Sequence, residues 1–147
     1  MLQVSIIILT YNSDKYIKGL LEGILKEYKK EIDENSYEVI VVDNASSDAT
    51  SKLVASFEKD GVLLIKNPEN IGFARGANVG AKKAEGKYLL FINPDAQLYS
   101  GKISDLILSF EKSGDAAIVG GRILNFSGKP ELSAGKFYNL INTFFWH

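Results

Sequence analysis

The sequence has no cysteine, and its single histidine, His147, is the last residue. Disulfides and thiolate metal sites are therefore excluded, and catalysis or metal binding by histidine is not expected in this chain. The lack of cysteine fits a reducing compartment. Long hydrophobic runs are also missing. Residues 4–9 are apolar but too few for a signal-peptide core or a membrane span, and no cationic segment precedes them.

Positive and negative charges are nearly balanced, so the chain has no surplus of either. Lysine and arginine together number 17, aspartate and glutamate 18, and the net charge is -1. Proteins that bind nucleic acid as a polymer carry a basic surplus, so no nucleic-acid partner is expected. The hydrophobic content of 46% and the charged content of 24% are ordinary for a globular protein. A chain of 147 residues is long enough for one domain, which we expect over residues 1–147.

Apolar runs alternate with segments of helical periodicity. The runs predict strands at residues 4–9, 37–42, 62–65, 88–92 and 116–119, of which those at 4–9, 37–42 and 88–92 are expected to be buried. Apolar or small residues at helical spacing predict helices near residues 16–28, 53–57, 74–84 and 106–110. This order predicts an α/β fold with a mainly parallel, Rossmann-like sheet flanked by helices. Beyond it, residues 122–126 are a candidate short strand and residues 127–130 a turn.

Polar residues follow the first four predicted strands. The clusters are Thr10-Tyr11-Asn12, Asp43-Asn44-Ala45-Ser46, residues 67–70 and Asn93-Pro94-Asp95. Because parallel strands end at the same edge of a sheet, these clusters should converge on one ligand cleft. Pro94 prevents an inner strand from continuing, so Asp95 should sit at a strand end, where we expect it to meet a cation.

Each acid also has a purely structural interpretation. Asp43 can be part of a turn and a helix N-cap, and Asp95 can be a turn acid. Arg75, one turn into a predicted helix, would usually be a solvated surface residue. For these residues taken singly, the sequence leaves both interpretations open.

Small residues mark the predicted helix at residues 74–84. Gly72, Gly76 and Gly80 lie four residues apart, which favours packing of a bare helix face against the sheet over contact with a ligand. Asn78 lies among these small residues, where a buried amide would need hydrogen-bond partners. No Gly-x-Gly-x-x-Gly follows the first predicted strand, so a dinucleotide-binding Rossmann site is not expected.

Four motifs occur in order along the chain. They are Val-Ser-Ile-Ile-Ile-Leu-Thr-Tyr-Asn-Ser (4–13), Val-Val-Asp-Asn-Ala-Ser-Ser-Asp (41–48), Asn-Ile-Gly-Phe-Ala-Arg-Gly-Ala-Asn (70–78) and Asn-Pro-Asp (93–95). Together they resemble the family 2 inverting glycosyltransferases of the GT-A (nucleotide-diphospho-sugar transferase) fold, particularly the rhamnosyltransferase-like branch. The resemblance covers nearly the whole chain, because residues 121–129 are similar to the segment that follows the metal motif in that family.

The resemblance implies a binding site for a nucleoside-diphosphate sugar. It assigns to this site Thr10, Tyr11, Asn12, Asp43, Asn44, Asn70, Gly72, Arg75, Asn78, Asn93 and Asp95. Asp43 would accept a hydrogen bond from the imide N–H of uracil or thymine, and a carboxylate, which only accepts, would disfavour cytosine. Asp95 stands in the second acid position of the Asp-x-Asp motif of the family, whose first acid is Asn93 here. It would ligate Mg²⁺ or Mn²⁺ beside the diphosphate.

The implied activity is metal-assisted, inverting transfer of a sugar to a saccharide or lipid-linked acceptor, as in the synthesis of surface polysaccharide. The cation would neutralise the departing nucleoside diphosphate, and a general base would take the proton of the acceptor. Relatives supply this base from a later acidic motif. Glu131 is the only acid after Asp115, without such a motif around it, so no catalytic residue is identified. The alternative is a non-catalytic fragment or module that binds a nucleotide sugar.

The last residues are rich in apolar side chains. They include Phe137, Tyr138, Leu140, Ile141, Phe144, Phe145 and Trp146. A domain rarely exposes so much apolar surface, so we expect a missing C-terminal portion, which would hold the base and the acceptor site, or a second copy of the chain to cover it. Cationic residues are scarce there, which disfavours a membrane-surface segment. The expected location is the cytoplasm, with the inner face of the cell membrane as a second option.

Overall fold

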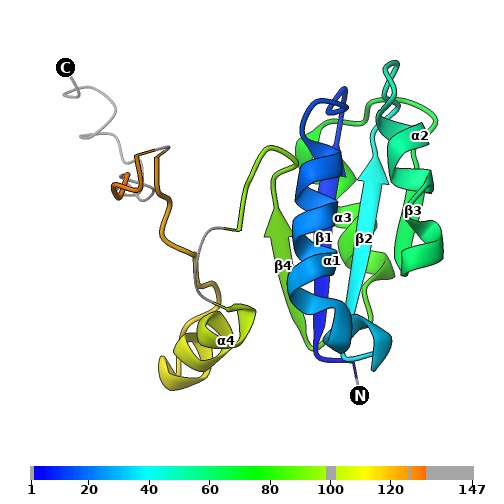
Figure 1. Ribbon diagram of the computed structural model, residues 1–147. Coiled ribbons are helices and arrows are strands. Elements are labelled where there is room, and N and C mark those ends of the chain that lie inside the picture. The colour runs from blue at the N-terminus through cyan, green and yellow to red at the C-terminus, as the bar shows by residue number, and fades with distance from the viewer. Residues whose placement is uncertain (1, 99–101, 126, 132–147) are drawn as a thin grey trace, which may run out of the picture. The chain divides into compact units, whose positions relative to one another are not determined.

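The computed structural model describes residues 2–98, 102–125 and 127–131. Contacts within the chain define two compact units, Met1–Gly101 and Lys102–His147. Among the described residues, the sheet lies in the first unit and one helix lies in the second (Figure 1). The expectation of one domain over residues 1–147 stays a prediction.

The first unit alternates strands and helices as the sequence predicts. The elements are β1 (Val4–Thr10), α1 (Ile17–Asp33), β2 (Tyr37–Asp43), α2 (Thr50–Ala55), the 3₁₀ helix η1 (Glu58–Asp60), β3 (Val62–Lys66), α3 (Phe73–Lys83) and β4 (Tyr88–Ile92). The strand order is β3-β2-β1-β4, and every pairing is parallel. The predicted α/β fold with a parallel sheet flanked by helices is confirmed.

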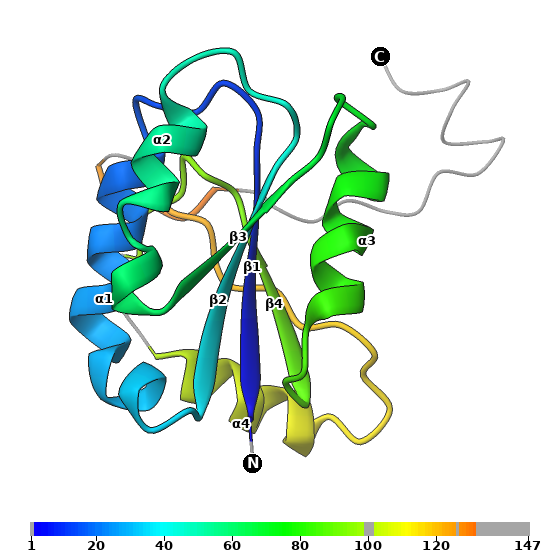
Figure 2. The ribbon, with the colours of Figure 1, turned by 90° about the vertical axis from the view of Figure 1, so that its right-hand side faces the viewer.

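The core lies around the two central strands. Figure 2 shows α1 and α2 on one face of the sheet and α3 on the other. On α1, apolar side chains recur every three or four residues and turn one face toward the sheet. The buried members are Ile17, Leu20, Leu21, Ile24, Tyr28 and Ile32. The sandwich of helices around β1 and β2 fixes the ends of these strands, where the polar clusters begin.

Two glycines bring α3 close to the sheet. A Cβ atom on Gly76 would lie 2.6 Å from Leu9 Cδ1, and one on Gly80 would lie 2.6 Å from Ile7 Cγ2. The predicted helix–sheet packing is therefore confirmed for these two residues. Gly72 differs: it is the N-cap of α3 with φ 82°, and a Cβ there would meet nothing within 4 Å.

The prediction that residues 88–92 form a strand is confirmed, but the prediction that this strand is buried is wrong. Leu89 is 44% exposed and Phe91 51% exposed. Within the described residues β4 pairs only with β1, so it forms an edge of the sheet. The register aligns Ser5 with Leu89 and Ile7 with Phe91, which places both side chains on the face that carries α3. They stay exposed because α3 packs on β1 and β2.

The second unit contains α4 (Ile103–Lys112) and an isolated antiparallel bridge between Leu124 and Pro130. The predicted strand at residues 116–119 is wrong. Ile118 is 89% exposed, and the run has no partner strand among the described residues. Of the candidate strand at residues 122–126, the described residues 122–125 form only that bridge. The expected turn follows, with a bond from Gly128 N to Asn125 O of 2.8 Å.

Two further expectations concern the chain as a whole. The apolar segment at residues 137–146 lies outside the described residues. No helix in the described part of the chain has the length and apolarity needed to cross a membrane.

Candidate functional site

The carboxyl ends of β1, β2 and β3 lie side by side. The register aligns Thr10 with Asp43 and Asp43 with Lys66. Backbone bonds continue this alignment past the strands, from Asn44 N to Thr10 O and from Asn67 N to Asp43 O, both of 2.8 Å. The predicted convergence of the first three polar clusters is therefore observed.

Asp43 lies at the centre of these strand ends and is 3% exposed. Its Oδ1 accepts hydrogen bonds from the hydroxyls of Thr10, at 3.1 Å, and Ser46. Its Oδ2 accepts from Ser46 N at a longer 3.3 Å. These donors offset the cost of burying the carboxylate and fix its orientation. Oδ1 thus takes part in the predicted turn, while Oδ2 has only one long contact among the described residues. The predicted ligand role of Asp43 stays a prediction.

Asn12 joins the loop after β1 to the loop after β2. Its backbone N–H donates to Ser46 Oγ at 2.9 Å, and its Oδ1 accepts from Ser47 N at 2.9 Å. The residue has φ 51°, a left-handed conformation that asparagine tolerates better than most residues. Next to it, Tyr11 is 52% exposed and offers a flat apolar ring at the edge of the cluster.

Asn44 joins the loop after β2 to the loop before α3, and is 2% exposed. Its Nδ2 donates to Asn70 Oδ1 at 2.7 Å, and its Oδ1 accepts from Asn67 Nδ2 at 3.0 Å. Asn70 Oδ1 also accepts from Gly72 N at 3.0 Å. Three loops are therefore connected through side chains as well as through the sheet.

Asp48 links the segment before α1 to the first residue of α2 through hydrogen bonds. Its carboxylate accepts from Thr50 N at 2.9 Å and from Asp14 N at 3.2 Å, and Thr50 Oγ1 accepts from Ser13 N at 2.7 Å. Partial burial alone would raise the pKa of Asp48, but the hydrogen bonds with Thr50 and Asp14 outweigh it and lower this pKa below its ordinary value. Asp48 and Thr50 thus hold the starts of α1 and α2 together beside the site.

Eight of the eleven predicted site residues are exposed. Four of these eight, Arg75, Asn78, Asn93 and Asp95, lie on α3 or directly after β4. Arg75 and Asn78 are three residues apart on α3 and share one side of that helix. The expectation of a buried Asn78 amide is wrong, because α3 buries only the face that carries Gly76 and Gly80.

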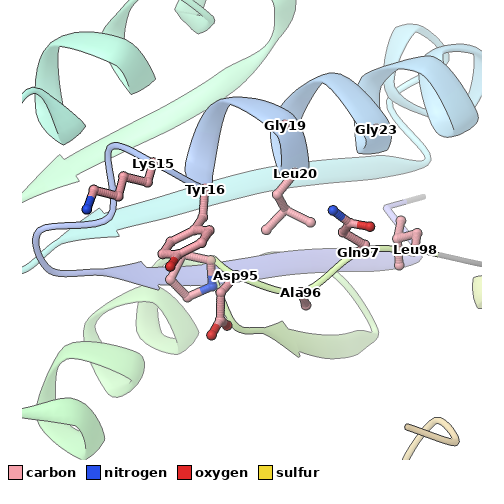
Figure 3. A pocket seen from close by; sticks show the side chains of 10 residues that line it. Lys15, Tyr16, Gly19, Leu20, Gly23, Asp95, Ala96, Gln97 and Leu98 are labelled. Carbon is pink, nitrogen blue, oxygen red and sulfur yellow. The ribbon is translucent and has the colours of Figure 1, made fainter. Parts of the chain in front are cut away.

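Asp95 follows β4 in a turn that the backbone closes, since Ala96 N donates to Asn93 O at 3.1 Å. The Asp95 carboxylate is exposed and makes no hydrogen bond or ion pair with another described residue. Figure 3 shows it beside Tyr16 at a cavity of about 320 Å³ between α1 and the segment after β4. The cavity is lined by Lys15, Tyr16, Gly19, Leu20, Gly23, Pro94, Asp95, Ala96, Gln97 and Leu98. The turn therefore does not use the carboxylate, which faces solvent beside a hollow surface.

The described residues contain no group of three or more potential metal-ligating histidine, cysteine or acidic side chains. A cation at Asp95 would therefore share its coordination with a ligand or with water. Mg²⁺ and Mn²⁺ fit such a site, because they prefer oxygen and Mg²⁺ is usually bound through one or two carboxylates together with substrate phosphates.

The sequence matches the family model described as glycosyl transferase family 2 over residues 5–146. The chain belongs to glycosyl transferase family 2. The resemblance stated from the four motifs is thereby confirmed at the level of the family, and the rhamnosyltransferase-like branch stays a prediction.

Curated and solved relatives agree with this family 2 assignment. Poly(ribitol-phosphate) beta-N-acetylglucosaminyltransferase TarS from Staphylococcus aureus (strain Mu50) is 30% identical over 134 residues, covering 89% of this chain and 23% of TarS. The crystal structure of S. aureus TarS 1-349 in complex with UDP-GlcNAc matches with a TM-score of 0.65 and 30% identity, over 76% of this chain and 32% of that one. The chain thus spans about a quarter of full-length TarS.

A solved relative from another organism has the same fold. The mannosyltransferase PcManGT from Pyrobaculum calidifontis, solved in complex with GDP-Man and Mn²⁺, matches with a TM-score of 0.64 and 27% identity, over 84% of this chain and 36% of that one. The predicted GT-A fold is therefore confirmed for the family 2 chain.

The site residues predicted from the sequence do not include those that join the loops by hydrogen bonds. Ser46 and Asn67 belong to the predicted polar clusters, but neither they nor Asp48 were among the residues assigned to nucleotide-sugar binding, although all three hold those residues in place. Asp48 lies one residue before Ala49, the N-cap of α2, and accepts a bond from Thr50 N. Aspartate is a residue type that favours the start of a helix, which is the signal that could have located it.

Proposed function

We propose that this chain binds a nucleoside-diphosphate sugar at the carboxyl ends of β1 to β4, as the donor site of a glycosyltransferase. The observation that carries the proposal is the buried Asp43 carboxylate, oriented by Thr10 and Ser46 where three loops join. The solved relatives whose titles name UDP-GlcNAc and GDP-Man support it. The sugar would pass, with inversion, to a saccharide or lipid-linked acceptor.

The base of the donor would lie between Tyr11 and Asp43. Tyr11 offers its exposed ring for stacking, and Asp43 Oδ2 offers an acceptor. Uracil and thymine present an imide N–H to such an acceptor, whereas cytosine presents a lone pair at the same ring position. We therefore favour a uracil or thymine nucleotide.

The diphosphate would lie toward Arg75 and Asp95. Arg75 is an exposed cation in the first turn of α3, where the helix dipole also favours an anion. Asp95 would hold Mg²⁺ or Mn²⁺, with Asn93 beside it. When bound, the cation supplies charge neutralisation for the departing nucleoside diphosphate. Asn78 and Gly72 complete this side of the proposed site.

A second candidate is a module that binds the nucleotide sugar without transferring the sugar. It is favoured by one observation: Glu131 is the last acid of the sequence and lies in no motif that resembles a general base. Assay of transfer to an acceptor, in the presence of Mn²⁺, separates the two candidates. The proposed location of either is the cytoplasm, in keeping with the absence of cysteine.

Calorimetric titration of the full chain with UDP, dTDP, GDP and CDP, each with and without Mn²⁺, tests the proposal. We expect UDP or dTDP to bind more tightly than CDP, with Mn²⁺ increasing the affinity. Asp95→Asn should remove the increase due to Mn²⁺ and leave the thermal unfolding temperature unchanged. Asp115→Asn, at an exposed acid of the second unit, is the matched control and should keep the Mn²⁺ effect. Absence of binding by all four nucleotides would overturn the proposal.

A further inference from the structure

Asn44 follows β2 directly and contacts the loop before α3 at both ends of that loop. At the start of the loop, Asn67 Nδ2 donates to Asn44 Oδ1 at 3.0 Å. At the end of the loop, Ile71 N donates to the same oxygen at 3.2 Å, and Asn44 Nδ2 donates to Asn70 Oδ1 at 2.7 Å. A longer bond of 3.4 Å runs from Nδ2 to Gly72 O.

These contacts use the full hydrogen-bonding capacity of the amide. A side-chain amide offers two donor hydrogens and two acceptor lone pairs. Asn44 Oδ1 accepts two bonds and Nδ2 donates two, and the residue is only 2% exposed. A ligand would therefore find neither free surface nor a free polar atom on this side chain.

We propose that Asn44 is a positioning residue, which sets the start of α3 and Arg75 relative to Asp43 and does not touch the nucleotide. The proposal rests on the proposed function, because it needs a nucleotide bound at these strand ends. It differs from the role that the family resemblance implies for Asn44, which is direct contact with the donor.

The path from Asn44 to Arg75 is short and made of hydrogen bonds. Asn70 Oδ1 accepts from both Asn44 Nδ2 and Gly72 N, so one oxygen links the buried amide to the N-cap of α3. Gly72 O then accepts from Gly76 N at 3.0 Å, the first bond of the helix. Arg75 lies within that turn. Loss of the Asn44 contact would let the turn shift, and small displacements of a binding group are costly for a charged ligand.

Two isosteric variants test the role of the contact. Asn44→Asp keeps the oxygen that accepts from Asn67 and Ile71, but replaces the donor to Asn70 with an acceptor, so two oxygens face each other. Asn70→Asp adds the same charge on the other side of the contact and keeps the oxygen that Asn44 and Gly72 bind. We expect Asn44→Asp to weaken UDP binding with Mn²⁺ roughly 10-fold or more, and Asn70→Asp to weaken it about fivefold at most. Equal losses would assign the effect to charge and overturn the proposal.

A double-mutant cycle tests whether the effect passes through Arg75. If Asn44 places Arg75, then Arg75→Ala should weaken UDP binding several-fold less in the Asn44→Asp background than in the wild type. Additive losses would show that the two residues act independently, and would overturn the proposal. If Asn44→Asp does not fold, Asn70→Ala replaces it in the cycle, because that exposed residue supplies the acceptor for Asn44.

Amide hydrogen exchange separates this proposal from the proposed function. Without ligand, Asn44→Asp should speed the exchange of Gly72 N and Gly76 N, whose bonds depend on the loop, and leave the amides of β1 unchanged. Unchanged exchange at both glycines would overturn the positioning role even where UDP binds. Faster exchange in a protein whose wild type binds no nucleotide would overturn the proposed function, and would leave only the structural link between Asn44 and the start of α3.

Discussion

Asp43 is the residue on which base selectivity depends in the proposed site. Asp43→Asn keeps an oxygen where Thr10 and Ser46 donate, and these two donors would direct its amide group to the position of Oδ2. A donor would then face the base. We expect affinity for UDP to fall roughly 10-fold, and the preference for UDP over CDP to shrink or invert. Calorimetry with both nucleotides measures this ratio, and an unchanged ratio would remove Asp43 from the base pocket.

Asp48 makes the free energy of unfolding of the protein depend on pH. Its pKa is lowered in the folded protein from the ordinary value of 3.8, because bonds with Thr50 and Asp14 outweigh the effect of burial. A lowered pKa means that the ionised carboxylate stabilises the fold above pH 3.8, and that this stabilisation is lost as the pH falls through the folded pKa.

Asp48→Asn should therefore unfold at a lower urea concentration than the wild type at pH 7, and the difference should shrink in acid. Urea unfolding at pH 7, 5, 4 and 3 measures it. Asp33→Asn, at an exposed acid in the last turn of α1, controls for the loss of one negative charge. A difference that stayed constant down to the lowest pH would contradict the role given to the Asp48 carboxylate.

At the scale of elements, α3 depends on the absence of side chains where it crosses β1. A Cβ atom on Gly80 would lie 2.6 Å from Ile7 Cγ2 and 3.1 Å from Val42 Cγ2. Both are branched side chains of the core, which cannot move away freely. Gly80→Ala should therefore destabilise the fold by about 1–3 kcal/mol, despite the better helix propensity of alanine.

Gly23→Ala is the matched control for this packing. Gly23 is also a helical glycine, but a Cβ there would meet nothing within 4 Å. Alanine should stabilise α1 by about 0.5–1 kcal/mol through its propensity. Urea unfolding of both variants measures the difference. Equal effects of the two substitutions would show that propensity, and not the approach of α3 to the sheet, sets the result.

At the scale of the whole molecule, the sequence predicts the sheet better than it predicts the loops. Strand periodicity is a local property, so β1 to β4 and the polar residues at their ends could be located from neighbouring residues alone. The bonds that join the loops connect residues distant in sequence, such as Asn12 with Ser47 and Asn44 with Asn70. They arise only when the register has aligned the strands, and no local pattern contains that information.

The wrong predictions on β4, residues 116–119 and Asn78 all concern contacts with parts of the chain distant in sequence. The apolar run at residues 88–92 does not show how many strands will pair with it. The sequence therefore predicts a buried strand, whereas β4 is an edge strand with Leu89 and Phe91 exposed. Residues 116–119 have the composition of a strand but no partner among the described residues. Asn78 lies among small residues, yet on the exposed side of α3. In each case burial depends on packing partners that the segment does not contain.

The hydrogen bonds between the three loops have a consequence for the entropy of binding. Side chains that are already held in one rotamer, such as Asn12, Asp43 and Asn44, lose their freedom when the chain folds. A nucleotide bound at the proposed site would not have to order them, so less of its interaction energy would go into immobilising the protein. If the proposed site binds a nucleotide, the hydrogen bonds around Asp43 move the entropic cost of ordering these side chains from the binding step to the folding step.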